Sequence, residues 1–249
     1  MRLSGYWQVL RGVGPVAAVR NMIAKRRTRR GQSGWLHSKD LQHPVLFRQG
    51  SSDLGVFAQI FITLEYLCFS DLVNPELIID LGANVGYSAA YFLSRFKDAF
   101  LICVEPDAEN FRLLEQNLAP YRDRCILIQA AVWPEMRQLW LDPATMGEEN
   151  EWGRQVTDRA SNGVPVEAVD IESLVAMTPY KRISILKVDI EGAEKELLSR
   201  NYKPWLDRTD NFCIEVHGPA SQEALDRAIV GQGYALSYSG ELTVGKRGR

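Results

Sequence analysis

Short apolar runs alternate with amphipathic segments through most of the chain after residue 76. The apolar runs predict strands at 77–80, 100–105, 125–132, 183–189 and 211–217. The amphipathic segments predict helices at 85–96, 106–118, 191–200 and 221–230. Strands that alternate with helices form βαβ units with right-handed crossovers. The pattern therefore predicts an α/β fold around a doubly wound, mostly parallel sheet.

The stretch from 138 to 170 is less regular. Residues 138–141 and 164–169 have strand-like composition. The polar residues 143–163 predict a long loop, which either covers a bound substrate or is simply mobile. Near the C-terminus, two strand-like runs at 234–238 and 241–244 are separated by Ser239-Gly240. This arrangement predicts a closing antiparallel hairpin.

The first 76 residues contain weaker signals. Residues 1–23 have apolar positions at helix-like spacing, interrupted by glycine and proline between 12 and 15. Residues 44–48 predict a short strand, and the series from Ser51 to Cys68 predicts the start and body of one helix. No second-domain linker or internal repeat is visible. We therefore expect a basic N-terminal extension at 1–43 and one domain at 44–249.

A strong charge asymmetry lies behind the formal net charge of −2. Residues 1–30 contain eight basic and no acidic residues, which leaves 21 basic and 31 acidic residues in the remainder. A basic segment on an acidic body predicts that the segment makes the electrostatic contact. Three interpretations stay open: a membrane-surface anchor, an arm that docks on another subunit of a homo-oligomer, and a partly ordered tail. The acidic body argues against nucleic-acid binding.

The cysteines and apolar runs bear on the compartment. The four cysteines are far apart and lack metal-ligand spacing, which predicts reduced core thiols and a reducing compartment. Arg11 and Arg20 interrupt any signal-peptide core, and no apolar run approaches the roughly 20 residues that span a bilayer. We expect a soluble cytoplasmic protein, or one that is peripheral to the inner face of the membrane.

The turn after the strand at 77–80 carries the clearest chemical signal. Gly82 and Gly86 lack Cβ atoms, so a ligand can approach the turn's backbone closely. A dinucleotide site needs G-x-G-x-x-G for its pyrophosphate, which the carboxylate of Asp80 would repel. Glu105 ends the next strand, where an acid can accept both ribose hydroxyls of an adenosine. These features fit S-adenosylmethionine better than NAD.

Asp80-Leu81-Gly82-Ala83-Asn84-Val85-Gly86 resembles motif I of class I S-adenosylmethionine-dependent methyltransferases. A wider set of segments resembles the FkbM methyltransferase family, namely residues 48–53, 104–107, 130–132, 186–194 and 214–217. The resemblance extends over roughly residues 44–240. It implies a Rossmann-like, seven-stranded sheet that ends in an antiparallel hairpin. It also implies O-methylation of a hydroxyl on a small molecule, sugar, glycan or glycosylated natural product.

The same resemblance implies a set of cofactor contacts. The methionine part of S-adenosylmethionine would contact the turn and the start of the following helix, at Asp80, Gly82, Ala83, Asn84, Gly86 and Ser88. Glu105, next to Pro106, would bind the ribose. Gln129, Ala130 and Ala131 would flank the adenine, and Asp189 would face the cofactor cleft.

Two later strands supply candidate catalytic groups. Side chains alternate along a strand, so Lys187 shares a face with Asp189, and Glu215 shares a face with His217. If the two strands are neighbours, these groups meet at the carboxyl edge, and Lys187 takes one of the acids as its partner. His217 is the best-tuned general base by its ordinary pKa of roughly 6.5, and Asp189 is the best-placed acid.

Several alternatives stay open at this stage. Asp189 and Glu191 also suit a helix N-terminus, and His217 also suits a satisfied strand end. A magnesium ion on Asp189, Glu215 or Glu191 is conceivable and undecided. Glu194 and Lys195 are expected on a helix surface. The competing functions are a nicotinamide-dependent oxidoreductase and a non-catalytic cofactor-binding protein whose basic arm docks on a membrane or partner.

Overall fold

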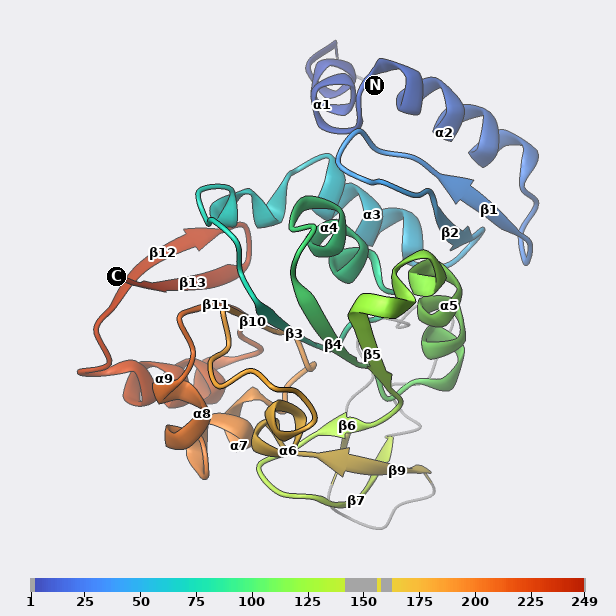
Figure 1. Ribbon diagram of the computed structural model, residues 1–249. Coiled ribbons are helices and arrows are strands. Elements are labelled where there is room, and N and C mark those ends of the chain that lie inside the picture. Colours follow the sequence, from blue (N-terminus) through green and yellow to red (C-terminus); the bar gives the residue numbers. More distant parts are fainter. Residues whose placement is uncertain (1–2, 142–155, 158–162, 249) are drawn as a thin grey trace.

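A seven-stranded sheet forms the centre of the molecule, in a computed structural model that describes residues 3–141, 156–157 and 163–248 (Figure 1). The strand order is β12-β13-β11-β10-β3-β4-β5. These strands are β3 (Leu77–Leu81), β4 (Phe100–Val104), β5 (Cys125–Ile128), β10 (Ile185–Val188), β11 (Asn211–Glu215), β12 (Tyr234–Ser239) and β13 (Leu242–Arg247). β3, β4, β5, β10 and β11 run parallel, and β13 is antiparallel to both β11 and β12. The predicted seven-stranded sheet with a closing hairpin is confirmed.

Helices cover both faces of this sheet, as a doubly wound fold requires (Figure 1). One face packs against α3 (Asp53–Phe61), α4 (Tyr87–Arg95) and α5 (Ala108–Leu118). The other face packs against α6 (Ile171–Ala176), α7 (Glu194–Ser199), α8 (Lys203–Asp207) and α9 (Pro219–Ile229). Strand residues alternate between the two cores, so Ile78 and Ile185 face the first and Ile79 and Leu186 the second.

The irregular middle of the chain forms a separate small sheet, with order β6-β9-β7-β8. Its strands are β6 (Ala131–Val132), β7 (Arg137–Leu141), β8 (Val156–Thr157) and β9 (Val164–Val169). The single strand expected at 125–132 is therefore wrong, because β5 stays in the large sheet while β6 pairs with β9. Most of the loop expected at 143–163 lies outside the described residues.

Two predicted helices begin or end at different residues. The helix expected to continue to Cys68 ends at Phe61, and Leu64 (φ 61°) takes a left-handed conformation before a 3₁₀ helix, η1 (Glu65–Phe69). The helix expected from residue 191 begins at Glu194, because Glu191 (φ 55°) and Gly192 (φ 102°) form a turn. Short elements between the predicted ones were missed: β1 (Ser33–Leu36), α6, α8 and η2 (Ala119–Arg124).

The N-terminal extension is folded onto the domain. Its helices α1 (Leu3–Val13) and α2 (Pro15–Arg27) form the outermost layer over α3 in Figure 1. Val13 and Ala17 are buried in the same core as the α3–α5 face of the sheet. β1 pairs with β2 (Val45–Arg48), so the extension and the domain share a two-stranded sheet. Among the described helices, none is long and apolar enough to cross a membrane.

Gly12 is a point of close contact between the extension and the domain. An added Cβ would lie 2.5 Å from the Phe61 carbonyl oxygen and 2.8 Å from Ile62 Cα. We expect Gly12→Ala to destabilise the protein by about 1–3 kcal/mol, because backbone atoms have to move. Helix propensity alone predicts the opposite sign, an increase of about 1 kcal/mol in the unfolding free energy. Urea unfolding of Gly12→Ala and the wild type distinguishes these two outcomes.

Gly248→Ala is the control for this substitution, since no atom lies within 4 Å of its added Cβ. An unchanged or higher unfolding free energy for Gly12→Ala would show that α1 does not pack closely on α3.

Candidate active site

The turn after β3 has an unusual backbone that glycine and asparagine permit. Gly82 (φ 75°), Asn84 (φ 50°) and Gly86 (φ 85°) all have positive φ angles. A Cβ on Gly82 would lie 1.7 Å from the carbonyl oxygen of Asp189, so no other residue fits there without displacing β10's end. The Gly82 and Ala83 amides donate to the Val104 carbonyl at 2.9 and 3.0 Å. The turn is therefore fixed between the ends of β4 and β10.

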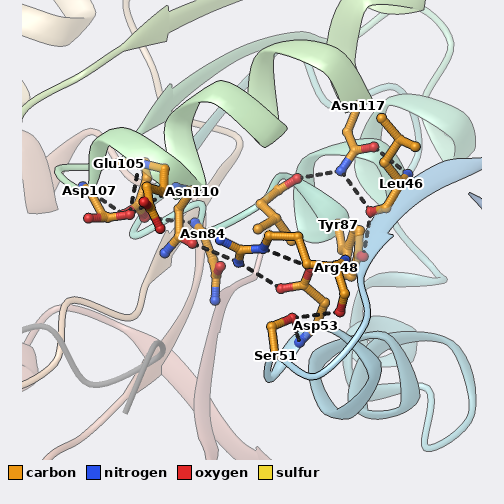
Figure 2. A network of polar contacts seen from close by, with 12 residues as sticks. Leu46, Arg48, Ser51, Asp53, Asn84, Tyr87, Glu105, Asp107, Asn110 and Asn117 are labelled. Atoms are coloured by element: carbon orange, nitrogen blue, oxygen red, sulfur yellow. Dashed lines mark hydrogen bonds and ion pairs between the residues drawn. The ribbon is translucent and has the colours of Figure 1, made fainter. Parts of the chain in front are cut away.

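Glu105, just after β4, is fixed against this turn by two backbone amides. Its Oε2 accepts from the Asn84 amide and its Oε1 from the Asp107 amide, both at 2.9 Å (Figure 2). Asp107 caps α5 by accepting from the amides of Glu109 and Asn110. Burial raises the pKa of Glu105 to about 7. Each carboxylate oxygen keeps a free lone pair for a ligand hydroxyl.

A second polar network supports the turn from the side of β2. Arg48 makes a bidentate pair with Asp53, with Nη2–Oδ1 at 2.8 Å and Nε–Oδ2 at 3.1 Å, and also donates to Asn110 Oδ1 at 2.9 Å (Figure 2). Asn117 accepts from the Leu46 amide at 2.6 Å and donates to the Val85 carbonyl at 2.8 Å. These bonds attach β2 to α5 and to the turn.

Lys187 connects the turn to the end of β10. Its side chain is buried, and Nζ lies 3.2 Å from Asp80 Oδ1 and 3.5 Å from Asp189 Oδ2. Nζ also donates to the Gly82 carbonyl at 2.5 Å. Burial alone would lower the pKa of Lys187, but the two carboxylates raise it above its ordinary value. Lys187 is therefore a fixed positive charge rather than a base.

The sheet register explains this arrangement. Lys187 lies opposite Asp80 on β3 and Cys213 on β11. The register confirms that β10 and β11 are neighbours. Of the acids that the sequence offered as partners of Lys187, Asp189 is the one within ion-pair distance. It adds Asp80 as a partner that the sequence analysis did not foresee. Asp80 also accepts a 2.5 Å hydrogen bond from Ser88 on α4.

His217 lies in a cluster of three acids. Its Nδ1 is 3.0 Å from Glu194 Oε1, and its Nε2 is 3.4 Å from Glu191 and 3.6 Å from Glu215. Hydrogen bonds with Glu194 and Glu215 raise the pKa of His217 to about 11. The imidazole is thus protonated at neutral pH, which does not suit the role of general base expected from its ordinary pKa.

Glu194 was expected on a helix surface, and the structure does not place it there. It is fully buried, and its carboxylate accepts from the Ile190 and Gly192 amides at 3.3 and 3.1 Å and from Ser221 Oγ at 3.4 Å. Because α7 begins only at Glu194, this side chain caps the turn before the helix instead of pointing to solvent. The prediction was wrong because it placed the helix start three residues too early.

A cleft opens over the turn and the strand ends. The predicted site residues that line it are Gly82, Ala83, Asn84, Ser88, Glu105, Pro106, Ala131, Lys187, Asp189 and Glu215. The remaining predicted residues, Asp80, Gly86, Gln129, Ala130 and His217, are not among the lining residues. Asp80 is buried beneath the turn, and Gln129 is exposed.

Several other residues that line the cleft were not predicted. They include Gln59, Glu65, Tyr66, Asn110 and Glu241. Gln59 Nε2 donates to Glu65 Oε1 at 2.8 Å, and burial raises the pKa of Glu65 to about 7. The only sequence signal was Glu65 itself, an acid within an apolar series that reads as one helix but folds as two segments.

Among the described residues that line the cleft, two have a buried acceptor oxygen without a hydrogen-bond partner: Asn84 Oδ1 and Asp189 Oδ1. Buried polar atoms are nearly always hydrogen-bonded, so such atoms call for a ligand that donates. Ligand groups that donate hydrogen bonds fit both atoms, whereas an anionic pyrophosphate fits neither.

The same strand ends bring potential metal ligands together. Atoms of Asp189, Glu215 and His217 lie within 4.8 Å of one another. His217 contacts Glu191 and Glu215 at 3.4 and 3.6 Å, and these are two of the three acids considered from the sequence as magnesium ligands. The three side chains form an ion-pair cluster, and the magnesium site stays a prediction.

Comparison with known proteins places this site in a family context. Residues 80–236 match the family described as the methyltransferase FkbM domain. The chain is 26% identical over 167 residues to the 2-O-methyltransferase NoeI of Sinorhizobium fredii, a match that covers 61% of this chain and 65% of NoeI. It is 21% identical over 184 residues to methyltransferase 1 of Beauveria bassiana, which covers 66% and 74% of the two chains.

A solved structure shares the fold. The crystal structure of methyltransferase FkbM from Methylobacillus flagellatus KT superposes with a TM-score of 0.50 at 16% identity, over 74% of this chain and 47% of that one. The match to NoeI spans just under two thirds of its length, and the match to the M. flagellatus protein spans about half. The likeness to the solved structure supports the Rossmann-like fold.

The charge state of His217 is directly measurable. The chain has three histidines, so their ring signals are resolvable by NMR, and His217→Gln assigns one of them. We expect His217 to stay protonated from pH 6 to beyond 8, while burial lowers the pKa of His37 below 6.5. Because folding raises the pKa of His217, its contribution to stability is complete below pH about 6.5 and is lost as pH rises toward 11.

A His217 signal that titrates near pH 6.5 would contradict this account of the cluster. In that case the imidazole would again be available as a base.

Proposed function

The chain belongs to the FkbM methyltransferase family, and we propose that its cleft binds S-adenosylmethionine and transfers the methyl group to a hydroxyl of the acceptor. The observation that carries this proposal is Glu105, held by two backbone amides, one of which belongs to Asn84, a residue with an unpartnered Oδ1. The carboxylate suits a pair of ribose hydroxyls, and Asn84 Oδ1 suits an ammonium group. The family assignment favours this donor over a nicotinamide dinucleotide.

S-adenosylmethionine supplies a methyl group on a sulfonium, which an oxygen nucleophile attacks in line. A hydroxyl is a weak nucleophile at neutral pH, so a group in the cleft has to accept its proton. Asp189 fits this role because its Oδ1 lies buried in the cleft without a partner. Burial raises the pKa of Asp189, which makes it a stronger base than an exposed aspartate. Lys187, 3.5 Å from Oδ2, orients the carboxylate and keeps it ionised.

The cleft is strongly acidic. Besides Glu105, its lining contains five carboxyl groups: Glu65, Asp189, Glu191, Glu215 and Glu241. Such a surface repels an anionic acceptor and provides many hydrogen-bond acceptors for hydroxyls. We propose a neutral or cationic polyhydroxylated acceptor, such as a sugar, a glycan or a glycosylated small molecule. The similarity to NoeI, a 2-O-methyltransferase, supports a hydroxyl as the methylated group.

We also propose that the protein works in the cytoplasm. All four cysteines are free thiols, and Cys103 and Cys213 are buried in the sheet. Free thiols of this kind persist in a reducing compartment.

Calorimetry tests the donor. We expect S-adenosylmethionine to bind and NAD not to bind. Glu105→Gln should weaken binding by about 10- to 100-fold, the loss of one or two hydrogen bonds to a charged acceptor. Because the pKa of Glu105 is about 7 and its ionised form binds, affinity should rise between pH 6 and 8.

Glu109→Gln is the matched control, since Glu109 is exposed and lies outside the cleft. Binding of NAD alone, or equal effects of the two substitutions, would overturn the proposed donor site.

Turnover tests the base. With methyl-labelled donor and a panel of methyl glycosides, Asp189→Asn should lower turnover by about 10²- to 10⁴-fold and change donor affinity by less than about threefold. The panel's deoxy counterparts should identify the hydroxyl that is methylated. Glu65→Gln and Glu191→Gln serve as comparisons, because both acids line the cleft and have pKa values of about 7. If either of them abolishes turnover while Asp189→Asn does not, Asp189 is not the base.

A further inference from the structure

The outward face of α2 is apolar, although its inward face already packs on the domain. Val16, Val19 and Ile23 are 66%, 50% and 43% exposed. Their spacing of three and four residues places them on one side of the helix. Ala17 is buried on the other side, so the exposed residues do not belong to the protein's own core.

Hydrogen bonds to residues 37–39 hold α1 and α2 in place on the domain. Asn21 on α2 donates to the His37 carbonyl and accepts from the His37 amide, both at 2.8 Å. Lys39 Nζ donates to the Arg11 carbonyl at 2.7 Å, and its amide donates to the Val13 carbonyl at 2.9 Å. These bonds fix the orientation of α2, so that Val16, Val19 and Ile23 face outward from an ordered helix and not from a flexible tail.

Positive charge surrounds this apolar stripe. The basic residues between residues 3 and 30 are all exposed, namely Arg11, Arg20, Lys25, Arg26, Arg27, Arg29 and Arg30. By helical geometry Arg20 and Arg27 flank one side of the stripe, and Arg26 flanks the other. Residues 1–30 contain no acid to balance them. Two exposed tryptophans, Trp7 on α1 (72%) and Trp35 on β1 (48%), lie in the same extension.

We infer that the outer face of the N-terminal extension binds an anionic membrane surface, with Val16, Val19 and Ile23 in the acyl boundary and the arginines at the lipid phosphates. An apolar stripe flanked by arginines suits the boundary between lipid head groups and acyl chains, and exposed tryptophan is common at that boundary. Basic residues near the surface add attraction to anionic lipid. This inference is independent of the proposed catalytic function.

Two other partners fit the same surface less well. A symmetric dimer through α2 would bring two strongly basic faces together, which costs binding energy. Nucleic acid would use the positive charge but would leave the central apolar stripe without a function. The lipid surface is the partner that matches both features.

Vesicle flotation with the full-length protein tests the inference. We expect binding to phosphatidylcholine vesicles that contain about 30% phosphatidylglycerol, at least about tenfold weaker binding to pure phosphatidylcholine, and weakening by salt. Val19→Asp and Ile23→Asp should each reduce binding at least about tenfold, because a carboxylate would enter the acyl boundary. Both positions are exposed, so the melting temperature should not change.

Val230→Asp is the matched control, a 77% exposed valine at the end of α9, and should bind vesicles as the wild type does. Three results would overturn the inference. The first is vesicle binding that the α2 substitutions leave unchanged. The second is no vesicle binding together with a dimer that Val19→Asp dissociates in light scattering. The third is no vesicle binding together with salt-sensitive binding to duplex DNA.

Discussion

The buried ammonium of Lys187 is the interaction on which the site depends. It compensates Asp80 beneath the turn and Asp189 at the cleft, and it binds the Gly82 carbonyl between them. Removing one partner from such a buried pair typically costs about 3–5 kcal/mol, because the remaining charge stays buried without compensation. One side chain thus fixes the positions of the turn after β3 (residues 82–86, the donor turn) and of Asp189, the candidate base. These are the two parts of the site that the proposed methyl transfer has to align.

The strand-end acids divide into roles by their surroundings. Glu105 is held by backbone amides against the turn, whereas Asp189 keeps a buried oxygen free in the cleft. Glu194 is buried and engages His217, which lies between it and the acids Glu191 and Glu215. His217 therefore links the turn between β10 and α7 to the end of β11. The same carboxylates raise its pKa to about 11, which does not suit the role of general base.

The fold was predictable because each core strand is a short apolar run that ends in polar residues, as Ile79-Asp80 and Val104-Glu105 show. The seven-stranded sheet, the donor turn and the meeting of Lys187 with Asp189 followed from that pattern and from the family resemblance. Features that depend on long-range contact did not follow. Leu64 adopts a left-handed turn that splits one apolar series into two segments. Glu194 became buried, and Gly12, which reads as a helix breaker, is a contact point for α3.

A structure with S-adenosylhomocysteine bound tests the account most directly. We expect the ribose hydroxyls to lie within hydrogen-bond distance of Glu105 and the sulfur to face the side of the cleft lined by Asp189. Lys187 should keep its contacts with both Asp80 and Asp189 in that complex. A nucleoside bound away from Glu105, or a sulfur directed away from Asp189, would contradict it.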